Sequence, residues 1–300
     1  MRTVLIEAVI TSYNQGDMIL EAVQSVCAQT RLPQKIIIVD DGSTDANSLR
    51  VLKDIEHASD LPVSVSVYYQ ENKGVSSARN AGIQKSAAPM ILVLDGDDRL
   101  EPDYIECVGQ LLWEHPFMVA ASSWMHTFGA LDAVICPDGG DISSFLSHNC
   151  CPATHIMRRE AFLKCGGYDE TMRSGFEDWD FFLNMLETHP QACIGIVDKP
   201  LIQYRTAPAS SNIKSMEKRL ALMRGIIERH MGSYQSHIAD AILGIEAIAD
   251  ARLYGWENEM AFAKADHREL SPLSKKFLEN PSYGDGGMAS AVRIASIEME

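Results

Sequence analysis

The chain has 300 residues, of which 46% are hydrophobic, so it can bury a substantial core as one large domain or as one domain with an extension. A formal net charge of −15 argues against attraction to bare nucleic acid or anionic lipid, and an anionic ligand would need a local cation. Seven cysteines, an odd number without a Cys-x-x-Cys pair, are unlike a disulfide framework or a thiolate zinc site and favour a reducing compartment.

The first apolar run, residues 3–10, is interrupted by Glu7 and lacks a small-residue cleavage site, which is typical of a strand and not of a signal peptide. No stretch approaches the roughly 18 apolar residues of a membrane span. We therefore expect a cytoplasmic protein without a transmembrane segment. Peripheral contact with the inner face of a membrane stays open.

Up to about residue 100, short apolar runs alternate with helical stretches. KIIIV (35–39) and MILVL (90–94) are nearly continuous apolar runs, TVLIEAVI (3–10) is apolar apart from Thr3 and Glu7, and the amphipathic MILEAVQSVCAQT (18–30) separates the first two strands in chain order. Such strands, separated by helices, predict an α/β domain with a parallel sheet covered on both faces. VSVSVYY (63–69) alternates strictly, which predicts a strand that is less completely covered.

Later segments are less regular. Residues 117–125 and 192–197 are candidate strands, and residues 176–187 are helix-like. From about 215 to 265 the spacing is helical, and we expect the apolar face of this stretch to be packed. That face comprises Ile238, Ile242, Ile245, Ala249 and Leu253. The tail after Leu270 is rich in Ser, Gly and Pro, which is typical of a partly mobile segment.

Polar groups follow three of the predicted strands: TSYN (11–14), DDGSTD (40–45) and DGDD (95–98). In an open parallel sheet, ligands bind outside the carboxyl ends of the strands. A single aspartate here is equally well a turn former or helix cap. Three carboxylates in DGDD exceed what capping needs and repel one another, which favours a divalent oxygen-seeking cation such as Mg²⁺ or Mn²⁺.

The order and spacing of five segments resemble the family-two glycosyltransferases with the GT-A fold, over roughly residues 3–210. The segments are TSYN, QTRLPQKIIIVDDGSTD, ENKGVSSARNAG, ILVLDGDDRLEP and GGYDETMRSGFEDWDFFLNM. The resemblance implies an α/β protein of GT-A type, with a mostly parallel sheet flanked by helices and a C-terminal helical extension. The glycosyltransferase domain would comprise residues 1–212, and residues 213–300 would form the extension with its tail.

By this resemblance, the strand ends hold an activated sugar nucleotide. Thr11 and Tyr13 would lie against the base, and Asp40 would accept a hydrogen bond from a pyrimidine imide, which suits UDP. Arg79 would face the diphosphate, as a fixed cation. Asp95 would lie near the ribose and the metal-bound waters. The alternatives are a packed aromatic for Tyr13 and a surface or interdomain salt bridge for Arg79.

Metal and catalytic residues follow from the same resemblance. Asp97 would ligate Mn²⁺ or Mg²⁺ directly with support from Asp95, and the cation would stabilise the departing diphosphate. Asp178, in the Glu-Asp motif, would be the general base of an inverting displacement. Acidic residues in a first helical turn also simply complement the helix dipole. Trp179 either lines the acceptor site or packs in the core.

The resemblance thus implies an inverting transfer of a hexosyl or N-acetylhexosaminyl group from a UDP-sugar donor to a saccharide or lipid-linked glycan acceptor, as in polysaccharide biosynthesis. Nucleic acid is not an expected partner. A catalytically silent GT-A domain, used for nucleotide-sugar binding or assembly, is the alternative. The pattern departs from the family at Ala207, where many members carry a histidine, which puts closure of the loop by Arg205 or Ser210 in doubt.

Overall fold

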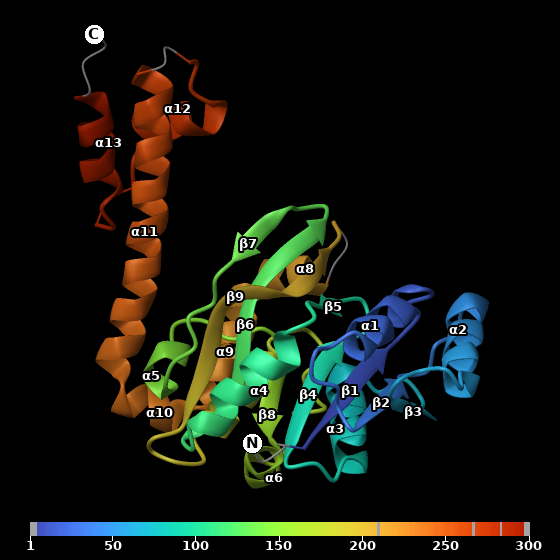
Figure 1. Ribbon diagram of the computed structural model, residues 1–300. Coiled ribbons are helices and arrows are strands. Elements are labelled where there is room, and N and C mark those ends of the chain that lie inside the picture. Colours follow the sequence, from blue (N-terminus) through green and yellow to red (C-terminus); the bar gives the residue numbers. More distant parts are fainter. Residues whose placement is uncertain (1–4, 209–210, 266–267, 283, 297–300) are drawn as a thin grey trace. The chain divides into compact units, whose positions relative to one another are not determined.

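A computed structural model describes residues 5–208, 211–265, 268–282 and 284–296 (Figure 1). The chain divides into two compact units, Met1–His237 and Ile238–Glu300. Among the described residues, nine strands form one sheet in the first unit, in the order β3-β2-β1-β4-β8-β6-β9-β5, with β7 paired to β6. The strands are β1 (Ile6–Ser12), β2 (Lys35–Asp40), β3 (Ser64–Tyr69), β4 (Met90–Asp95), β5 (Arg99–Leu100), β6 (Met118–Gly129), β7 (Ala133–Ile135), β8 (His155–Arg158) and β9 (Cys193–Thr206).

The helices of the first unit are α1 (Met18–Cys27), α2 (Ala46–His57), α3 (Val75–Lys85), α4 (Tyr104–Glu114), α5 (Ile142–Phe145), α6 (Arg159–Cys165), α7 (Glu177–Leu186), α8 (Ser211–Glu217), α9 (Arg219–Arg229) and α10 (Met231–Ser236). The parallel pairings β3-β2-β1-β4 form one half of the sheet. In the other half, β8 runs antiparallel to both β4 and β6, whereas β9 runs parallel to β6. The predicted α/β, mostly parallel architecture is therefore confirmed.

Both faces of the parallel half are covered, which explains its nearly continuous apolar strands. On one face, Ile10 of β1 packs in a core with Ile19 of α1 and Leu52 of α2. On the other face, Val9 meets α3 so closely that a Cβ at Gly82 would lie 2.4 Å from its Cγ1. The strand β3 lies at the sheet edge with only part of its surface buried, as its alternating sequence predicted.

Register brings the three polar strand ends to one edge of the sheet. Thr11 of β1 is paired with Asp95 of β4, and its neighbour Ser12 is paired with Asp40 of β2. Parallel strands that end at the same level place their following loops side by side. The carboxyl ends of β1, β2 and β4 therefore form a single polar rim.

The first unit extends beyond residue 212, where the sequence suggested a boundary. The imidazole of His230, between α9 and α10, contacts Asp180 and Glu187 at 3.2 and 3.0 Å. The hydroxyl of Tyr234 donates a hydrogen bond to the carbonyl of Leu146 at 2.8 Å. These polar contacts attach α9 and α10 to α7 and to the end of α5, which accords with a compact unit that ends at His237.

The second unit contains α11 (Ile238–Ala265), α12 (Pro272–Glu279) and α13 (Gly287–Ala295). Its α13 packs against α11, where Arg293 forms an ion pair with Glu257 at 2.5 Å. Two helices thus occupy the tail for which composition suggested mobility. Ser271 caps α12 by accepting a hydrogen bond from the backbone N–H of Ser274, and Pro272 suits the first turn.

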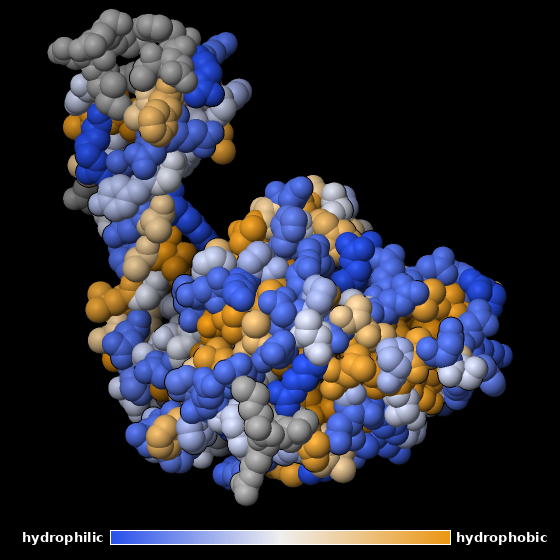
Figure 2. Space-filling model, viewed as in Figure 1, coloured by the Kyte–Doolittle hydropathy of each residue, from blue (hydrophilic) through white to orange (hydrophobic). Residues whose placement is uncertain are grey.

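The prediction that the apolar face of the long helix α11 is packed is wrong. Ile238, Ile242 and Ile245 are 61%, 60% and 43% exposed. Helical spacing correctly indicated the helix, but spacing alone does not supply a surface to cover its apolar face. Figure 2 shows hydrophobic residues on the molecular surface along this helix. None of the described helices is long and apolar enough to cross a membrane.

Candidate active site

The end of β4 is tied closely to the end of β1. The hydroxyl of Thr11 donates a hydrogen bond to Asp95 at 3.2 Å, and the backbone N–H of Gly96 donates to the carbonyl of Thr11 at 3.0 Å. A Cβ at Gly96 would lie 2.1 Å from Oε1 of Gln15 and 2.6 Å from the Thr11 carbonyl. Glycine is therefore required for the acidic loop to approach β1 this closely.

The two aspartates that end β2 have different partners. Asp40 is buried, and its carboxylate accepts hydrogen bonds from the backbone N–H and the hydroxyl of Ser43 at 2.9 and 2.5 Å. Asp41 accepts from the backbone N–H groups of Lys73 and Gly74 and from the side chain of Gln70. Asp41 thus fixes the loop that enters α3, a role that the sequence reading missed although DDGSTD displays both carboxylates.

Tyr13 projects from the rim after β1. Its side chain is 49% exposed, which speaks against the packed-aromatic alternative. The next residue, Asn14, has a positive φ of 51° and accepts hydrogen bonds at its side-chain oxygen from the backbone N–H groups of Thr44 and Asp45. The loops after β1 and β2 are therefore bonded to each other, with Tyr13 on the open side.

Arg79 joins the strand rim to α7. Its side chain is 2% exposed, and Nη2 lies 2.8 and 3.0 Å from the two carboxylate oxygens of Asp95. Nη1 donates to Glu177 at 3.3 Å, and the guanidinium lies over the ring of Tyr168. Burial alone would lower the pKa of Arg79, but the charge of Asp95, the interactions with Tyr168 and Glu177 and the hydrogen bond to Asp95 together outweigh burial and raise that pKa. Arg79 thus forms a buried salt bridge within the first unit, with Asp95 at the end of β4, and not the surface or interdomain pair that was the alternative.

The remaining carboxylates of DGDD differ in their surroundings. Asp98 is buried and accepts a hydrogen bond from the backbone N–H of Arg205 at 2.8 Å, so it anchors β9. Asp97 has one long contact at 3.4 Å, from the side-chain amide of Gln15. Burial and then the charge of Asp95 raise the pKa of Asp97. The side chain of Arg205 is bound to Glu21 and to the Asp97 carbonyl, at 2.7 and 2.9 Å.

These contacts define how a divalent cation could be held. In the described part of the chain, no three His, Cys, Asp or Glu side chains form a metal-binding group. Asp95 is occupied by Arg79 and Thr11, whereas Asp97 keeps an oxygen available and its ionised form would gain from a nearby cation. Because Mg²⁺ is typically held by one or two carboxylates plus substrate phosphates and water, Asp97 fits such an ion.

Asp178 lies in the first turn of α7, next to Glu177. Burial, reinforced by the charge of Glu177, raises the pKa of Asp178 to about 7. One carboxylate oxygen accepts a hydrogen bond from the side-chain amide of Asn149 at 3.0 Å, and the other accepts from the backbone N–H of Trp179 at 2.8 Å. A carboxylate with a pKa near neutrality is suited to general base catalysis.

Asn149 was not expected from the sequence, which separates it from Asp178 by 29 positions and offers no motif. Its side-chain oxygen accepts a hydrogen bond from the backbone N–H of Cys151, so its amide group is directed at Asp178. Trp179 is buried and donates its indole N–H to the carbonyl of Phe145 at 2.7 Å. Of the two alternatives for Trp179, the structure therefore favours the core.

The chain belongs to glycosyl transferase family 2, whose model matches residues 7–166. An uncharacterized glycosyltransferase of Bacillus subtilis, YwdF, is 27% identical over 59% of this chain and 66% of its own length. Chondroitin synthase of Escherichia coli is 39% identical over 35% of this chain and 15% of its own length. The chain thus matches less than two thirds of either relative.

Two crystal structures of S. aureus TarS 1-349 share the fold. The complex with UDP has a TM-score of 0.58 at 15% identity and covers 97% of this chain and 81% of that chain. The complex with UDP-GlcNAc has a TM-score of 0.56 at 17% identity and covers 69% of this chain and 60% of that chain. At these identities the likeness establishes the GT-A type of fold.

Proposed function

We propose that this protein transfers a sugar from a UDP-sugar donor to a hydroxyl of a saccharide or lipid-linked acceptor, with inversion at the anomeric carbon. The observation that carries the proposal is the contact series from Asp95 through Arg79 to Glu177, the neighbour of Asp178. These contacts link the carboxyl ends of β1, β2 and β4, where we place the nucleotide, to the helix that carries Asp178. The pKa of Asp178 is raised to about 7. The proposed donor site and the proposed general base therefore lie in one compact unit, as a displacement reaction requires.

The donor would bind along the rim formed by β1, β2 and β4. Tyr13 offers an exposed ring for the base, and Asp40 offers carboxylate oxygens already oriented by Ser43. Thr11 and Asp95 lie together at the centre of the rim, where the ribose would sit, and Arg79 supplies the buried positive charge. The related folds that bind UDP and UDP-GlcNAc favour a uridine donor and, among sugars, an N-acetylhexosaminyl group.

Mn²⁺ or Mg²⁺ is the proposed cofactor, with Asp97 as its direct protein ligand and Asp95 beside it. When bound, the cation neutralises the charge that develops on the departing diphosphate. Burial and then repulsion from Asp95 raise the pKa of Asp97 in the protein alone, and a cation would relieve this repulsion, which supports the assignment. The diphosphate and water would complete the coordination.

In the transfer step, the acceptor oxygen forms a bond to the anomeric carbon while the bond from that carbon to the UDP oxygen breaks. The acceptor hydroxyl gives its proton to the Asp178 carboxylate, and UDP leaves with the electron pair of the broken bond. Asn149 and the backbone N–H of Trp179 keep the carboxylate oriented. Because Asp97 and Asp178 are both present, we do not favour the catalytically silent alternative.

The donor and metal assignments are tested by ligand-dependent melting. UDP should raise the melting temperature of the protein when Mn²⁺ or Mg²⁺ is present and much less in a chelator. Asp97→Ala should abolish this metal dependence without unfolding the protein. Equal stabilisation by UDP with and without cation would contradict the metal assignment, and no stabilisation under either condition would contradict the donor assignment. A panel of UDP-sugars, assayed by UDP release, then identifies the transferred sugar.

A further inference from the structure

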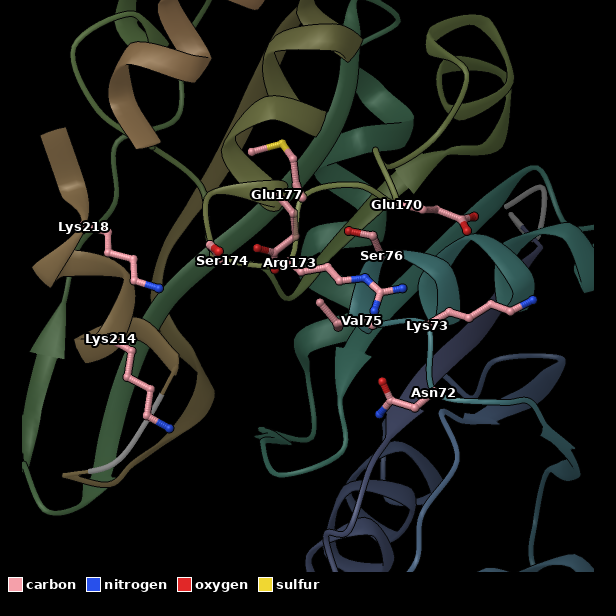
Figure 3. Close-up of a pocket in the computed structure, with 13 residues that line it drawn as sticks. Asn72, Lys73, Val75, Ser76, Glu170, Arg173, Ser174, Glu177, Lys214 and Lys218 are labelled. Carbon is pink, nitrogen blue, oxygen red and sulfur yellow. The ribbon is translucent and has the colours of Figure 1, made fainter. Parts of the chain in front are cut away.

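A pocket of about 420 Å³ opens between the N-terminus of α3, the loop before α7 and the helix α8 (Figure 3). Its lining includes four cationic side chains, Lys73, Arg173, Lys214 and Lys218, and two carboxylates, Glu170 and Glu177. A local excess of positive charge stands out in a chain of net charge −15. In Figure 3, Lys214 and Lys218 extend into the pocket from one wall, the guanidinium of Arg173 points away from both of them, and the Lys73 ammonium points away from the pocket.

The two carboxylates of the pocket are already engaged, but the cations are not. Glu177 accepts a hydrogen bond from Arg79, and Glu170 accepts one from Asn80 at 3.0 Å. Within the described residues, Arg173, Lys214 and Lys218 have no carboxylate at ion-pair distance. Like charges on the walls of one pocket without a counter-charge repel one another, and an anion bound in the pocket would relieve that repulsion.

The N-terminus of α3 adds hydrogen-bond donors to the same pocket. This helix of 11 residues begins after Gly74, which has a φ of 92° and offers no side-chain cap. Ser76 lines the pocket and is 2% exposed, and its hydroxyl has no hydrogen-bond partner in the described part of the chain. A buried hydroxyl without a partner is costly, and a ligand oxygen would satisfy it. The first turn of a helix also favours negative charge.

Tight packing holds these groups in place. Gly175 has a φ of 109°, and a Cβ there would lie 2.4 Å from the Cβ of Ser215 on α8. Glycine thus allows the loop before α7 to press against α8, which carries Lys214 and is followed directly by Lys218. On the other side, a Cβ at Gly74 would lie 3.8 Å from the Cγ of Arg173, so the arginine stem covers the entrance to α3.

The pocket lies apart from the residues assigned to the donor. None of Thr11, Tyr13, Asp40, Asp95 and Asp97 lines it. It reaches the proposed active site through Glu177, the neighbour of the proposed base Asp178. An anion bound here would therefore belong to the substrate that approaches the base, which is the acceptor.

We propose that this pocket binds an anionic group of the acceptor, a phosphate or a carboxylate, so that the enzyme glycosylates an acidic saccharide or a phosphate-bearing acceptor. The inference rests on the proposed transfer function and adds a substrate class to it. Arg173, Lys214 and Lys218 provide the charge, and Ser76 with the N-terminus of α3 provides neutral donors. A neutral acceptor would leave the three cations without a counter-charge.

Calorimetric titration of the whole protein with inorganic phosphate, and in parallel with glucuronate, tests the pocket. Binding of phosphate indicates a phosphorylated acceptor and binding of glucuronate a carboxylated one, and glucose should not bind. Arg173→Gln and Lys218→Gln should each weaken anion binding about tenfold, the loss of one charge-assisted contact. Lys53→Gln, the same change at an exposed position of α2, is the matched control and should bind normally.

Ser76→Ala separates binding from folding without changing charge. It should weaken anion binding and leave the melting temperature unchanged or raised, because the unpartnered hydroxyl is removed. A lowered melting temperature with normal anion binding would assign Ser76 a structural role.

Two results would overturn the proposal: binding of neither anion, or equal affinity in the wild type and all pocket variants. Competition between the anion and UDP would also overturn it, since the pocket would then serve the donor diphosphate. UDP affinity measured on the same samples reports separately on the proposed function.

Discussion

Arg79 binds both carboxylate oxygens of Asp95 through a single nitrogen, at 2.8 and 3.0 Å, from a position that is almost fully buried. The contact joins α3 to the end of β4, and the other terminal nitrogen continues to Glu177 on α7. One side chain therefore holds together three elements that are distant in sequence. Its charge holds these elements together and, in the proposed function, would also face the anionic donor.

Replacing Arg79 by methionine leaves two largely buried carboxylates without their cation. We expect the free energy of unfolding to fall by roughly 3 kcal/mol, as for other broken buried pairs, and UDP affinity to fall with it. Urea titration measures the first effect. The exposed pair of Arg50 and Asp54 supplies the control, since Arg50→Met should cost less than about 1 kcal/mol. An equal cost for both variants would refute the structural role of Arg79.

Asp178→Asn retains the size of the side chain but cannot accept the proton from the acceptor hydroxyl. The transfer rate should fall by about 10² or more, whereas UDP affinity should hardly change. An aspartate that only complemented the dipole or capped the helix would behave differently, since asparagine caps about as well. Near-normal transfer would exclude Asp178 as the base, and parallel loss of transfer and UDP binding would place it in the donor site.

The pH dependence of transfer reports on the same carboxylate. Since burial and Glu177 raise the pKa of Asp178 to about 7, activity should rise through pH 7 as the base loses its proton and should level off above it. Asn149→Ala removes a hydrogen bond to the ionised form, so the midpoint should move to higher pH. A purely structural Asn149 would change the melting temperature and leave the midpoint where it was.

Gly96→Ala tests the close approach of the acidic loop to β1. The new Cβ would meet the carbonyl of Thr11 at 2.6 Å, and this backbone atom cannot move without disturbing the strand pairing. Overpacking of this kind typically costs about 1–3 kcal/mol, and UDP affinity should fall because the rim is displaced. At Gly225, in α9, a Cβ meets nothing within 4 Å, so Gly225→Ala should be neutral or stabilising. Unfolding in urea compares the two variants.

The attachment of α10 should depend on pH through His230. Burial alone would lower the pKa of His230, but its contacts with Asp180 and Glu187 raise it to about 9. The folded pKa lies above the unfolded value of roughly 6.5, so this stabilisation is complete below about pH 6.5 and is lost as the pH rises through 9. Melting temperature should fall over that window in the wild type, and His230→Gln should flatten the fall. An unchanged slope in the variant would disprove the assignment.

Much of the first unit was predictable because local pattern and burial agree there. Nearly continuous apolar runs gave the strands β1, β2 and β4, and the polar residues after them lie at one edge, as parallel pairing requires. Side-chain partners were not predictable. Arg79 meets Glu177 across 98 positions, and Asn149 meets Asp178 across 29, through contacts that depend on how α3 and α7 pack and leave no periodic signal.

The same limit explains the errors in the second half of the chain. Periodicity found α11, but it does not reveal whether an apolar stripe is covered, and Ile242 is exposed. The boundary near residue 212 followed the end of recognisable motifs. The structure continues the first unit to His237 because buried polar contacts, such as the one from Tyr234 to Leu146, attach the next helices to it.

The hydrogen bonds from the backbone N–H groups of Lys73 and Gly74 to the Asp41 carboxylate also have a thermodynamic consequence. A loop that is ordered only when its ligand arrives loses conformational entropy at each binding event, and this loss weakens affinity. Here the loop that enters α3 is already fixed by a carboxylate of the protein itself. The loop therefore loses its conformational entropy during folding and not at each binding event. The proposed anion pocket beside it is preorganised.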